Sequence, residues 1–158
     1  MSNIKVSNND IKSKLADIVR QISITENWKP DVILAPSRGG LIPGVMLSHY
    51  FSVPFEGFKW QTRDGKIQDD KTLKHILDHH AGQNVLIIDD INDTGKTLCE
   101  IKDCVDHIMK GNVKWLHGEV KYAALYERFN TSFHNIDFVG EVVESEQWFD
   151  FPWENWWI

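Results

Sequence analysis

The sequence predicts an α/β domain in which a mostly parallel sheet carries helices on both faces. Apolar runs of strand length alternate along the chain with segments of helical periodicity. Two of these runs, residues 32–35 and 85–88, are apolar throughout, as expected of central strands that are covered on both faces. The 158 residues fit a single domain, 1–158, and the 42% hydrophobic content suits a globular core.

The N-terminal part of the chain is predicted to contain a helix, a strand, a second helix and a second strand. The first helix is indicated by an apolar stripe at helical spacing, with Ser7 or Asn8 as its N-cap. The stripe consists of Ile11, Leu15, Ile18, Val19 and Ile22. A strand follows Pro30, a helix runs to about Tyr50, and residues 53–60 form the next strand.

The remaining elements continue this alternation without repeats or low-complexity tracts. The polar, glycine-containing segment 61–70 favours a mobile loop. Segment 111–119 fits either a helical extension or a hairpin. The predicted helices are 71–80 and 98–109, and the predicted strands are 120–126 and 137–143.

Val85–Leu98 is the most informative segment, because a buried strand leads there into an acidic pair and then into a short turn. Asp89 and Asp90 fall at the carboxyl end of the strand, where open α/β sheets bind their ligands. The backbone N–H groups and hydroxyls of the turn suit an anion of phosphate size. The turn consists of Asp93, Thr94, Gly95, Lys96 and Thr97. Ordinary helix capping needs one such residue, so this crowding indicates a binding site.

The ending Gly95-Lys96-Thr97 also matches the end of a P-loop. That pattern needs a glycine where Asp90 stands, and a carboxylate there would repel the phosphate that the loop must wrap. A P-loop nucleotidase is therefore the weaker interpretation of this segment.

A second apolar strand, residues 32–35, leads into the glycine-rich turn Pro36–Gly44. Its glycines let the backbone come close to a ligand. Arg38 adds a planar fork of donors that suits phosphate oxygens. Taken alone, this segment also fits an ordinary turn between a strand and a helix.

The C-terminal segment is unusually aromatic, since six of the last eleven residues are Phe or Trp. One interpretation is a terminal segment that packs on the core, because aromatic side chains dominate burial wherever they occur. The other is a lid whose rings stack on a flat heterocycle.

Val85–Leu98 resembles the phosphoribosyl-pyrophosphate (PRPP) motif of type I phosphoribosyltransferases: a hydrophobic run, Asp-Asp, then Asp-Thr-Gly-x-Thr. In that family the acidic pair binds the ribose hydroxyls and the turn holds the 5′-phosphate. The residue types agree, because carboxylates accept hydrogen bonds from hydroxyls and phosphate oxygens need donors. The resemblance implies Mg²⁺, bound through water to Asp89 and Asp90. It also implies that Asp93 accepts or relays a proton of the base.

The run Ser37, Arg38, Gly39 and Gly40 resembles the pyrophosphate loop of bacterial xanthine-guanine phosphoribosyltransferases. Members of that group often hold a non-proline cis peptide in this loop. We therefore expect a cis peptide near Ser37 and Arg38.

The pattern Trp148-Phe-x-x-Pro-Trp-Glu154 resembles the ending of the same group, which implies an aromatic hood over residues 144–158. By position, Trp148 or Phe149 would stack on the base. The family's flexible loop corresponds to residues 59–70. The basic residues of this loop that could close over the pyrophosphate are Lys59, Arg63 and Lys66.

One position departs from the resemblance. The group carries a lysine that donates to the purine 6-oxygen, and Glu127 stands at the nearest matching position. An ionised glutamate cannot donate a hydrogen bond. Either Arg128 contacts the base through a shifted register, or the preferred base is an unusual one.

The function that the resemblance implies is a Mg²⁺-dependent transfer of 5-phosphoribose from PRPP to a nucleobase, with a purine as the expected substrate. The products would be pyrophosphate and a nucleoside monophosphate, the pathway purine salvage, and the assembly a homodimer. A non-catalytic or regulatory PRPP-binding module is the alternative.

Composition argues against other partners. The formal net charge is −6 and no basic cluster stands out along the chain, so we expect neither a nucleic acid nor an anionic membrane as a partner. Cys99 and Cys104 are five residues apart, which suits neither a disulfide framework nor a zinc site. With no signal peptide at the start, they are expected to be buried thiols in the cytoplasm.

Overall fold

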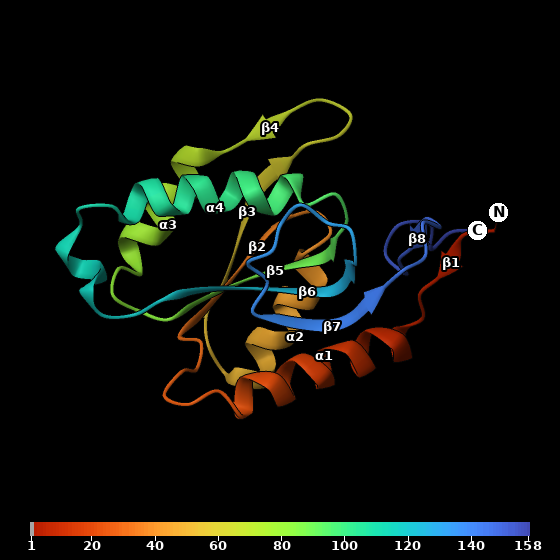
Figure 1. The fold of residues 1–158 in the computed structure, drawn as a ribbon, viewed down its shortest axis with the longest axis horizontal. Helices are drawn as coiled ribbons and strands as arrows, with labels where there is room; N and C mark the ends of the chain where they lie inside the picture. The colour runs from red at the N-terminus through yellow and green to blue at the C-terminus, as the bar shows by residue number, and fades with distance from the viewer. Residues whose placement is uncertain (1) are drawn as a thin grey trace.

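In the computed structural model, which describes residues 2–158, a six-stranded sheet lies between two layers of helices (Figure 1). The strand order is β4-β3-β2-β5-β6-β7. Strands β3 to β7 pair in parallel along this order, whereas β4 pairs with β3 in the antiparallel direction. The predicted α/β class with a mostly parallel sheet is confirmed. The strands are β2 Val32–Ser37, β3 Phe55–Gln61, β4 Ile67–Gln68, β5 Val85–Asn92, β6 Val120–Arg128 and β7 Phe138–Val143.

Each face of the sheet has its own hydrophobic core. Helices α1 and α2 pack on one face, and α3 and α4 pack on the other. Side chains of β5 alternate between them, because successive residues of a strand point to opposite faces. Leu86 and Ile88 belong to the first core, and Val85 and Ile87 belong to the second. The helices are α1 Asn8–Ser23, α2 Leu41–Phe51, α3 Asp70–His79 and α4 Lys96–Met109.

The N-cap of α1 is Ser7, one of the two predicted residues. The Ser7 hydroxyl accepts a hydrogen bond from the Asp10 N–H at 3.1 Å, and the Asp10 carboxylate accepts one from the Ser7 N–H at 2.7 Å. This reciprocal capping box fixes where the helix begins.

A second, two-stranded sheet joins the ends of the chain. Strand β1, Ile4–Lys5, pairs in parallel with β8, Phe149–Asp150. The two ends of the chain therefore lie close together, next to β1 and β8 (Figure 1). The N-terminal segment thus supports the aromatic C-terminal segment that was predicted to form a hood.

Two segments differ from the sequence-based expectation. The predicted loop 61–70 contains β4, so part of it is a hairpin that extends β3. Segment 111–119 is neither a helical extension nor a hairpin, because Gly111 has a positive φ of 70° and a 3-10 helix, η1, spans Val113–Leu116. Glycine tolerates this backbone conformation, which ends α4.

A carboxylate of α4, that of Glu100, contacts both strands of the β3–β4 hairpin. Glu100 accepts hydrogen bonds from the side chains of Trp60 and Gln68. Lys66 lies 3.9 Å from the same carboxylate. The turn of this hairpin is thereby held close to the start of α4.

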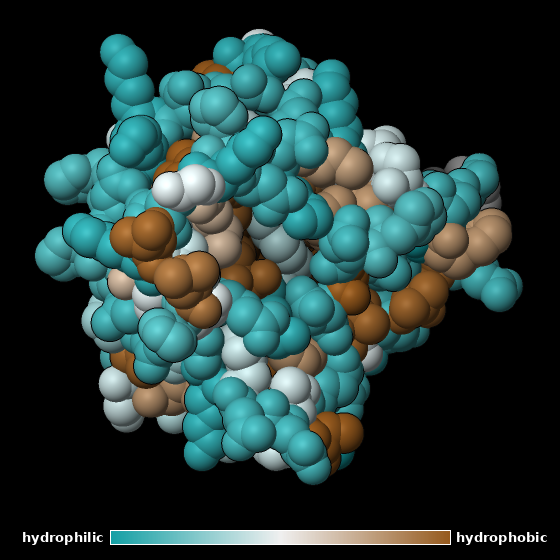
Figure 2. Space-filling model, turned by 60° about the vertical axis from the view of Figure 1, so that its left-hand side comes forward, coloured by the Kyte–Doolittle hydropathy of each residue, from teal (hydrophilic) through white to brown (hydrophobic). Residues whose placement is uncertain are grey.

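The face of the molecule shown in Figure 2 is predominantly hydrophilic. Hydrophilic residues cover most of it, and hydrophobic residues form small separate groups.

Cys99 and Cys104 are free thiols that are half-buried, rather than fully buried as predicted. No helix within residues 2–158 combines the length and the apolar character needed to cross a lipid bilayer.

Candidate active site

The carboxyl ends of β2, β5 and β6 meet at one cavity of about 760 Å³. Four segments form its walls: the loop after β2, the turn of the β3–β4 hairpin, the end of β5 with the start of α4, and the C-terminal segment. The site residues predicted from the sequence line this cavity, except Gly40, Glu127 and the two loop lysines, Lys59 and Lys66.

The acidic pair lies at the bottom of the cavity, at the end of β5. The Asp89 side chain accepts a hydrogen bond from the Asp90 N–H at 2.9 Å, and the Asp90 side chain accepts one from the Ile91 N–H at 2.7 Å. Burial raises the pKa of Asp89 well above its ordinary value, and repulsion by Asp90 adds to this. Burial also raises the pKa of Asp90 to about 6, with a further contribution from Glu154.

No basic side chain within residues 2–158 forms an ion pair with either member of this pair. Asp89 and Asp90 can therefore accept hydrogen bonds from a sugar diol or bind a hard cation, for which carboxylate oxygens are the preferred ligands. The described part of the chain contains no cluster of three or more His, Cys, Asp and Glu side chains that could hold a metal ion.

The loop after β2 packs directly on the acidic pair. Its Ser37–Arg38 peptide bond is cis, as predicted. A Cβ at Gly39 would lie 2.2 Å from the Asp90 carboxylate, so a larger residue would collide with it. Glycine at this position lets the two sequence motifs meet.

The turn that opens α4 packs against residues 132 and 133, which hold it in place. Gly95 is the N-cap of α4 with a φ of 92°, and a Cβ there would lie 2.4 Å from the backbone nitrogen of Phe133. The Thr94 carbonyl accepts hydrogen bonds from the N–H and the hydroxyl of Ser132, at 2.9 and 2.7 Å. The first N–H groups of α4 have no partner within the helix, so this turn is suited to an anion.

A buried polar network lies beneath this turn. Asn92, which is 1% exposed, donates to the Glu127 carboxylate at 3.0 Å and to the Phe133 carbonyl at 3.2 Å. Its side-chain oxygen accepts a hydrogen bond from the Thr131 hydroxyl at 3.0 Å. Glu127 thus contacts Asn92 instead of lining the cavity, and its position gives no support to a contact with the base.

Apart from Glu127, sequence reasoning missed the residues that support this turn. Asn92, Thr131 and Ser132 hold the phosphate-sized turn in place, although Thr131 and Ser132 lie more than thirty residues away in sequence. The signal available was the polar run 130–132, which begins two residues after the end of β6, at the sheet edge where β5 also ends.

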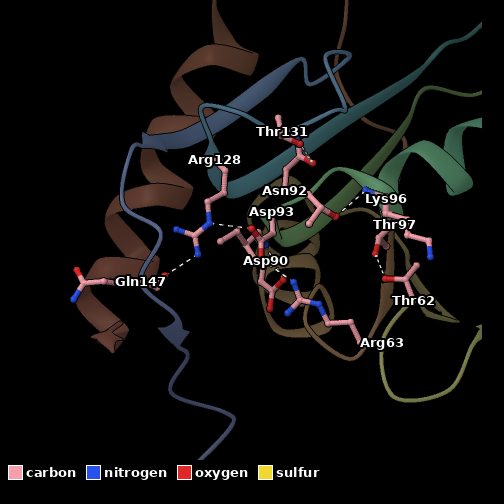
Figure 3. A network of polar contacts seen from close by, with 12 residues as sticks. Thr62, Arg63, Asp90, Asn92, Asp93, Lys96, Thr97, Arg128, Thr131 and Gln147 are labelled. Carbon is pink, nitrogen blue, oxygen red and sulfur yellow. Dashed lines mark hydrogen bonds and ion pairs between the residues drawn. The ribbon is translucent and has the colours of Figure 1, made fainter. Parts of the chain in front are cut away.

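Asp93 is paired with two arginines (Figure 3). Its Oδ1 atom is 2.9 Å from Arg128 Nε, and its Oδ2 atom is 2.9 Å from Arg63 Nη2. Arg128 also donates to the backbone carbonyls of Ser145 and Gln147. It therefore joins the end of β6 to the C-terminal segment.

The two predicted stacking residues have different environments. Phe149 is buried, and its ring lies 4.8 Å from that of Tyr126. Trp148 is 49% exposed, and the guanidinium of Arg63 lies 5.0 Å from its ring centroid. Trp148 thus offers the freer face to a planar ligand, and Phe149 anchors the segment.

A buried carboxylate pair lies beside a helix start that is suited to an anion, at the carboxyl ends of a parallel sheet, and this arrangement is typical of α/β proteins that bind phosphorylated ligands. Residues 4–156 match the family described as the phosphoribosyl transferase domain, and the chain belongs to this family. The resemblance seen in the sequence is thereby confirmed.

The chain is also similar to individual proteins in sequence or in fold. The xanthine-guanine phosphoribosyltransferase of Idiomarina loihiensis is 23% identical over 152 residues, which cover 94% of this chain and 85% of that protein. A purine phosphoribosyltransferase from Pyrococcus horikoshii has a TM-score of 0.68 and 25% identity, over 98% of this chain and 95% of that one. A Neisseria gonorrhoeae protein solved with bound ppGpp has a TM-score of 0.67 and 22% identity, over 98% and 91%.

The raised pKa of Asp90 predicts how its charge affects stability. The carboxyl has an ordinary pKa of 3.8 and a folded-state pKa of about 6, so the folded state binds more protons between these values. The free energy of unfolding therefore falls as pH rises through this window. We expect Asp90→Asn to raise the free energy of unfolding at pH 7.5 by up to roughly 3 kcal/mol, and to change it little at pH 4.

Denaturant titrations between pH 4 and 8 measure this effect. Asp103→Asn, which removes the charge of an exposed aspartate on α4, is the matched control. A gain that is the same at pH 4 and pH 7.5 would contradict the assignment.

Gly95→Ala is expected to destabilise the fold by about 1–3 kcal/mol, because it combines a left-handed backbone with a collision against the Phe133 backbone. Gly111→Ala is the matched control, since Gly111 also has a positive φ but has open space around it. Urea denaturation should show a clearly larger loss for Gly95→Ala. Equal losses would mean that the turn can move away from the 131–133 segment.

Proposed function

We propose that this protein transfers 5-phosphoribose from PRPP to a nucleobase, with a purine as the preferred acceptor, and releases pyrophosphate. The supporting observation is that the acidic pair, the turn that opens α4 and the loop after β2 line one cavity. The packing of Gly39 on Asp90 brings the loop and the pair together. A substrate with a diol, a terminal phosphate and a pyrophosphate presents matching groups to the three segments.

The binding roles follow from hydrogen-bond chemistry. Asp89 and Asp90 accept hydrogen bonds from the ribose hydroxyls. The N–H groups at the start of α4 donate to the 5′-phosphate, together with side chains of the same turn. The residues of this phosphate site are Thr94, Gly95, Lys96 and Thr97. The residues that donate to the pyrophosphate are Ser37, Arg38, Gly39 and Gly40.

The reaction breaks the bond between C1 of the ribose and the pyrophosphate oxygen, and forms a bond from C1 to a ring nitrogen of the base. Donors that are already in place around the leaving pyrophosphate stabilise the charge that develops on it. Asp93, at the end of the phosphate turn, accepts the proton that the base nitrogen loses. Trp148 stacks on the base, and the C-terminal segment excludes water, which would otherwise hydrolyse PRPP.

Mg²⁺ is the cofactor that fits the donor set. Asp89 and Asp90 offer only oxygen atoms, which suit a hard cation, and contact through water is compatible with their hydrogen bonds. When bound, the ion supplies positive charge against the departing pyrophosphate. The ion's other ligands would be substrate oxygens and water.

The cellular setting that we propose is purine salvage in the cytoplasm. Two free thiols, Cys99 and Cys104, support a reducing compartment. We further propose a homodimer. Helix α2 exposes Ile42, Val45 and Tyr50, an apolar face that a second subunit could cover.

A PRPP-binding module without catalysis is the second candidate. It is favoured by Asp93, both of whose oxygens pair with arginines in the free protein. It is also favoured by position 127, where Glu127 stands in place of the lysine that the resemblance implies and contacts Asn92, so this position provides no donor to the base. Such a module would bind PRPP with Mg²⁺ and release no pyrophosphate.

Pyrophosphate release from PRPP separates the two functions. With Mg²⁺ present, we expect release with at least one of guanine, hypoxanthine, xanthine and adenine, and little with pyrimidines. PRPP binding without release on any base would establish the binding module instead.

The variant Asp89→Asn, Asp90→Asn tests the role of the acidic pair in PRPP binding. Each lost hydrogen bond to a charged group costs about 1.5–3 kcal/mol, so PRPP affinity in calorimetry should fall by at least roughly 100-fold. Asp103→Asn again serves as the control. Unchanged affinity in the double variant would refute the ribose-binding role.

Glu127 provides a further test, because its carboxylate accepts from the buried Asn92 side chain. Glu127→Gln keeps an acceptor and should preserve both stability and the ranking of bases. Glu127→Lys leaves Asn92 without this partner and should destabilise the fold by about 1–3 kcal/mol, again without changing the ranking. A shift of Glu127→Lys toward 6-oxopurines in the release assay would show that position 127 faces the base.

A further inference from the structure

The two arginines on Asp93 differ in how firmly they are held. The Arg128 side chain is 8% exposed, and besides Asp93 it contacts two backbone carbonyls and lies 5.2 Å from the Phe149 ring centroid. The Arg63 side chain is 52% exposed and comes from the turn of the β3–β4 hairpin. Arg128 is therefore a fixed partner of Asp93, and Arg63 is an exchangeable one.

Arg63 covers two groups that a nucleobase needs. Its guanidinium is 2.9 Å from Asp93 Oδ2, and it lies over Trp148 at 5.0 Å from the ring centroid. Under the proposed function, Asp93 accepts the proton of the base and Trp148 stacks on it. All three residues line the same cavity. The guanidinium therefore occupies the space that the base would enter.

We propose that Arg63 is a latch, a side chain that closes the base side of the cavity in the free protein and that an entering base must displace. This inference rests on the proposed function. When the Arg63 side chain moves away, Oδ2 of Asp93 becomes available to accept a hydrogen bond from the base. Arg128 remains on Oδ1 and keeps the carboxylate oriented.

The latch opens by movement of one side chain, because the hairpin itself is tied down. The hydroxyl of Thr62, the residue before Arg63, lies 3.0 Å from the Thr97 hydroxyl in the phosphate turn. Trp60 and Gln68 on either side of the turn bind Glu100 of α4. Figure 3 shows Thr62 directed toward Thr97 and Arg63 directed into the cavity.

The strength of the latch sets the size of its effect. An exposed ion pair and an exposed cation–π contact are each weak, and together they correspond to about a 3- to 30-fold change in affinity. This is small enough for a substrate to overcome. It is large enough to lower the affinity of every ligand that carries a base.

Comparing two ligands separates the effect of the base from that of the ribose and the phosphate. Ribose 5-phosphate offers the diol and the phosphate without a base, and guanosine 5′-monophosphate adds a base to the same groups. In calorimetry, Arg63→Ala should bind guanosine 5′-monophosphate about 3- to 30-fold more tightly than the wild-type protein does. Its affinity for ribose 5-phosphate should be unchanged. Adenosine 5′-monophosphate should gain by a similar factor, because displacement does not depend on the edge of the base.

Arg20→Ala is the matched control, since Arg20 is an exposed arginine that pairs with Asp17 at 2.6 Å on α1, outside the cavity. It should alter neither affinity. Unchanged or weaker nucleotide binding in Arg63→Ala would overturn the latch, and so would gains that differ strongly between the two nucleotides. Failure of ribose 5-phosphate to bind the wild-type protein would instead count against the proposed function.

Discussion

Two neighbouring carboxylates buried at the end of β5 are the constraint on which the rest of the site depends. The strand lies between β2 and β6 and is covered by a core on each face, so Asp89 and Asp90 emerge from a largely apolar region. Burial raises the pKa of both groups, which means that the free protein holds them at an energetic cost. Hydroxyl donors or a cation from a ligand offset that cost. Under the proposed function, the binding energy is thereby concentrated at the ribose.

The surroundings of this pair divide into a fixed part and an exchangeable part. The turn that opens α4 is held by the buried network around Asn92 and by Ser132, and Arg128 holds the C-terminal segment. The contacts of Arg63 lie on the open side of the cavity and involve an exposed side chain. Such a division suits a binding site, because a rigid floor keeps donors aimed at phosphate groups while a mobile side chain admits the ligand.

The sequence was informative where the signal is local. The apolar run 85–88 and the polar segment that follows it predicted both the central strand and the site, because period and turn chemistry are encoded within a few residues. The two-residue strands β1 and β8 gave no such signal, since they form only by pairing across the whole chain. The orientation of Glu127 also could not be read locally. Adjacent residues of a strand face opposite ways, so a shift of one position exchanges Glu127 with Arg128 at the cavity.

The central claim is that the acidic pair is buried without a counter-charge until a ligand arrives. Carbon-13 NMR of the aspartate carboxyls, assigned with single Asp→Asn variants, measures this directly. In the free protein, Asp90 should titrate near pH 6 and Asp89 well above its ordinary range. Addition of Mg²⁺ with ribose 5-phosphate should lower both titration midpoints, because donors and positive charge favour the ionised forms. Two carboxyls that both titrate near pH 4 in the free protein would contradict the account.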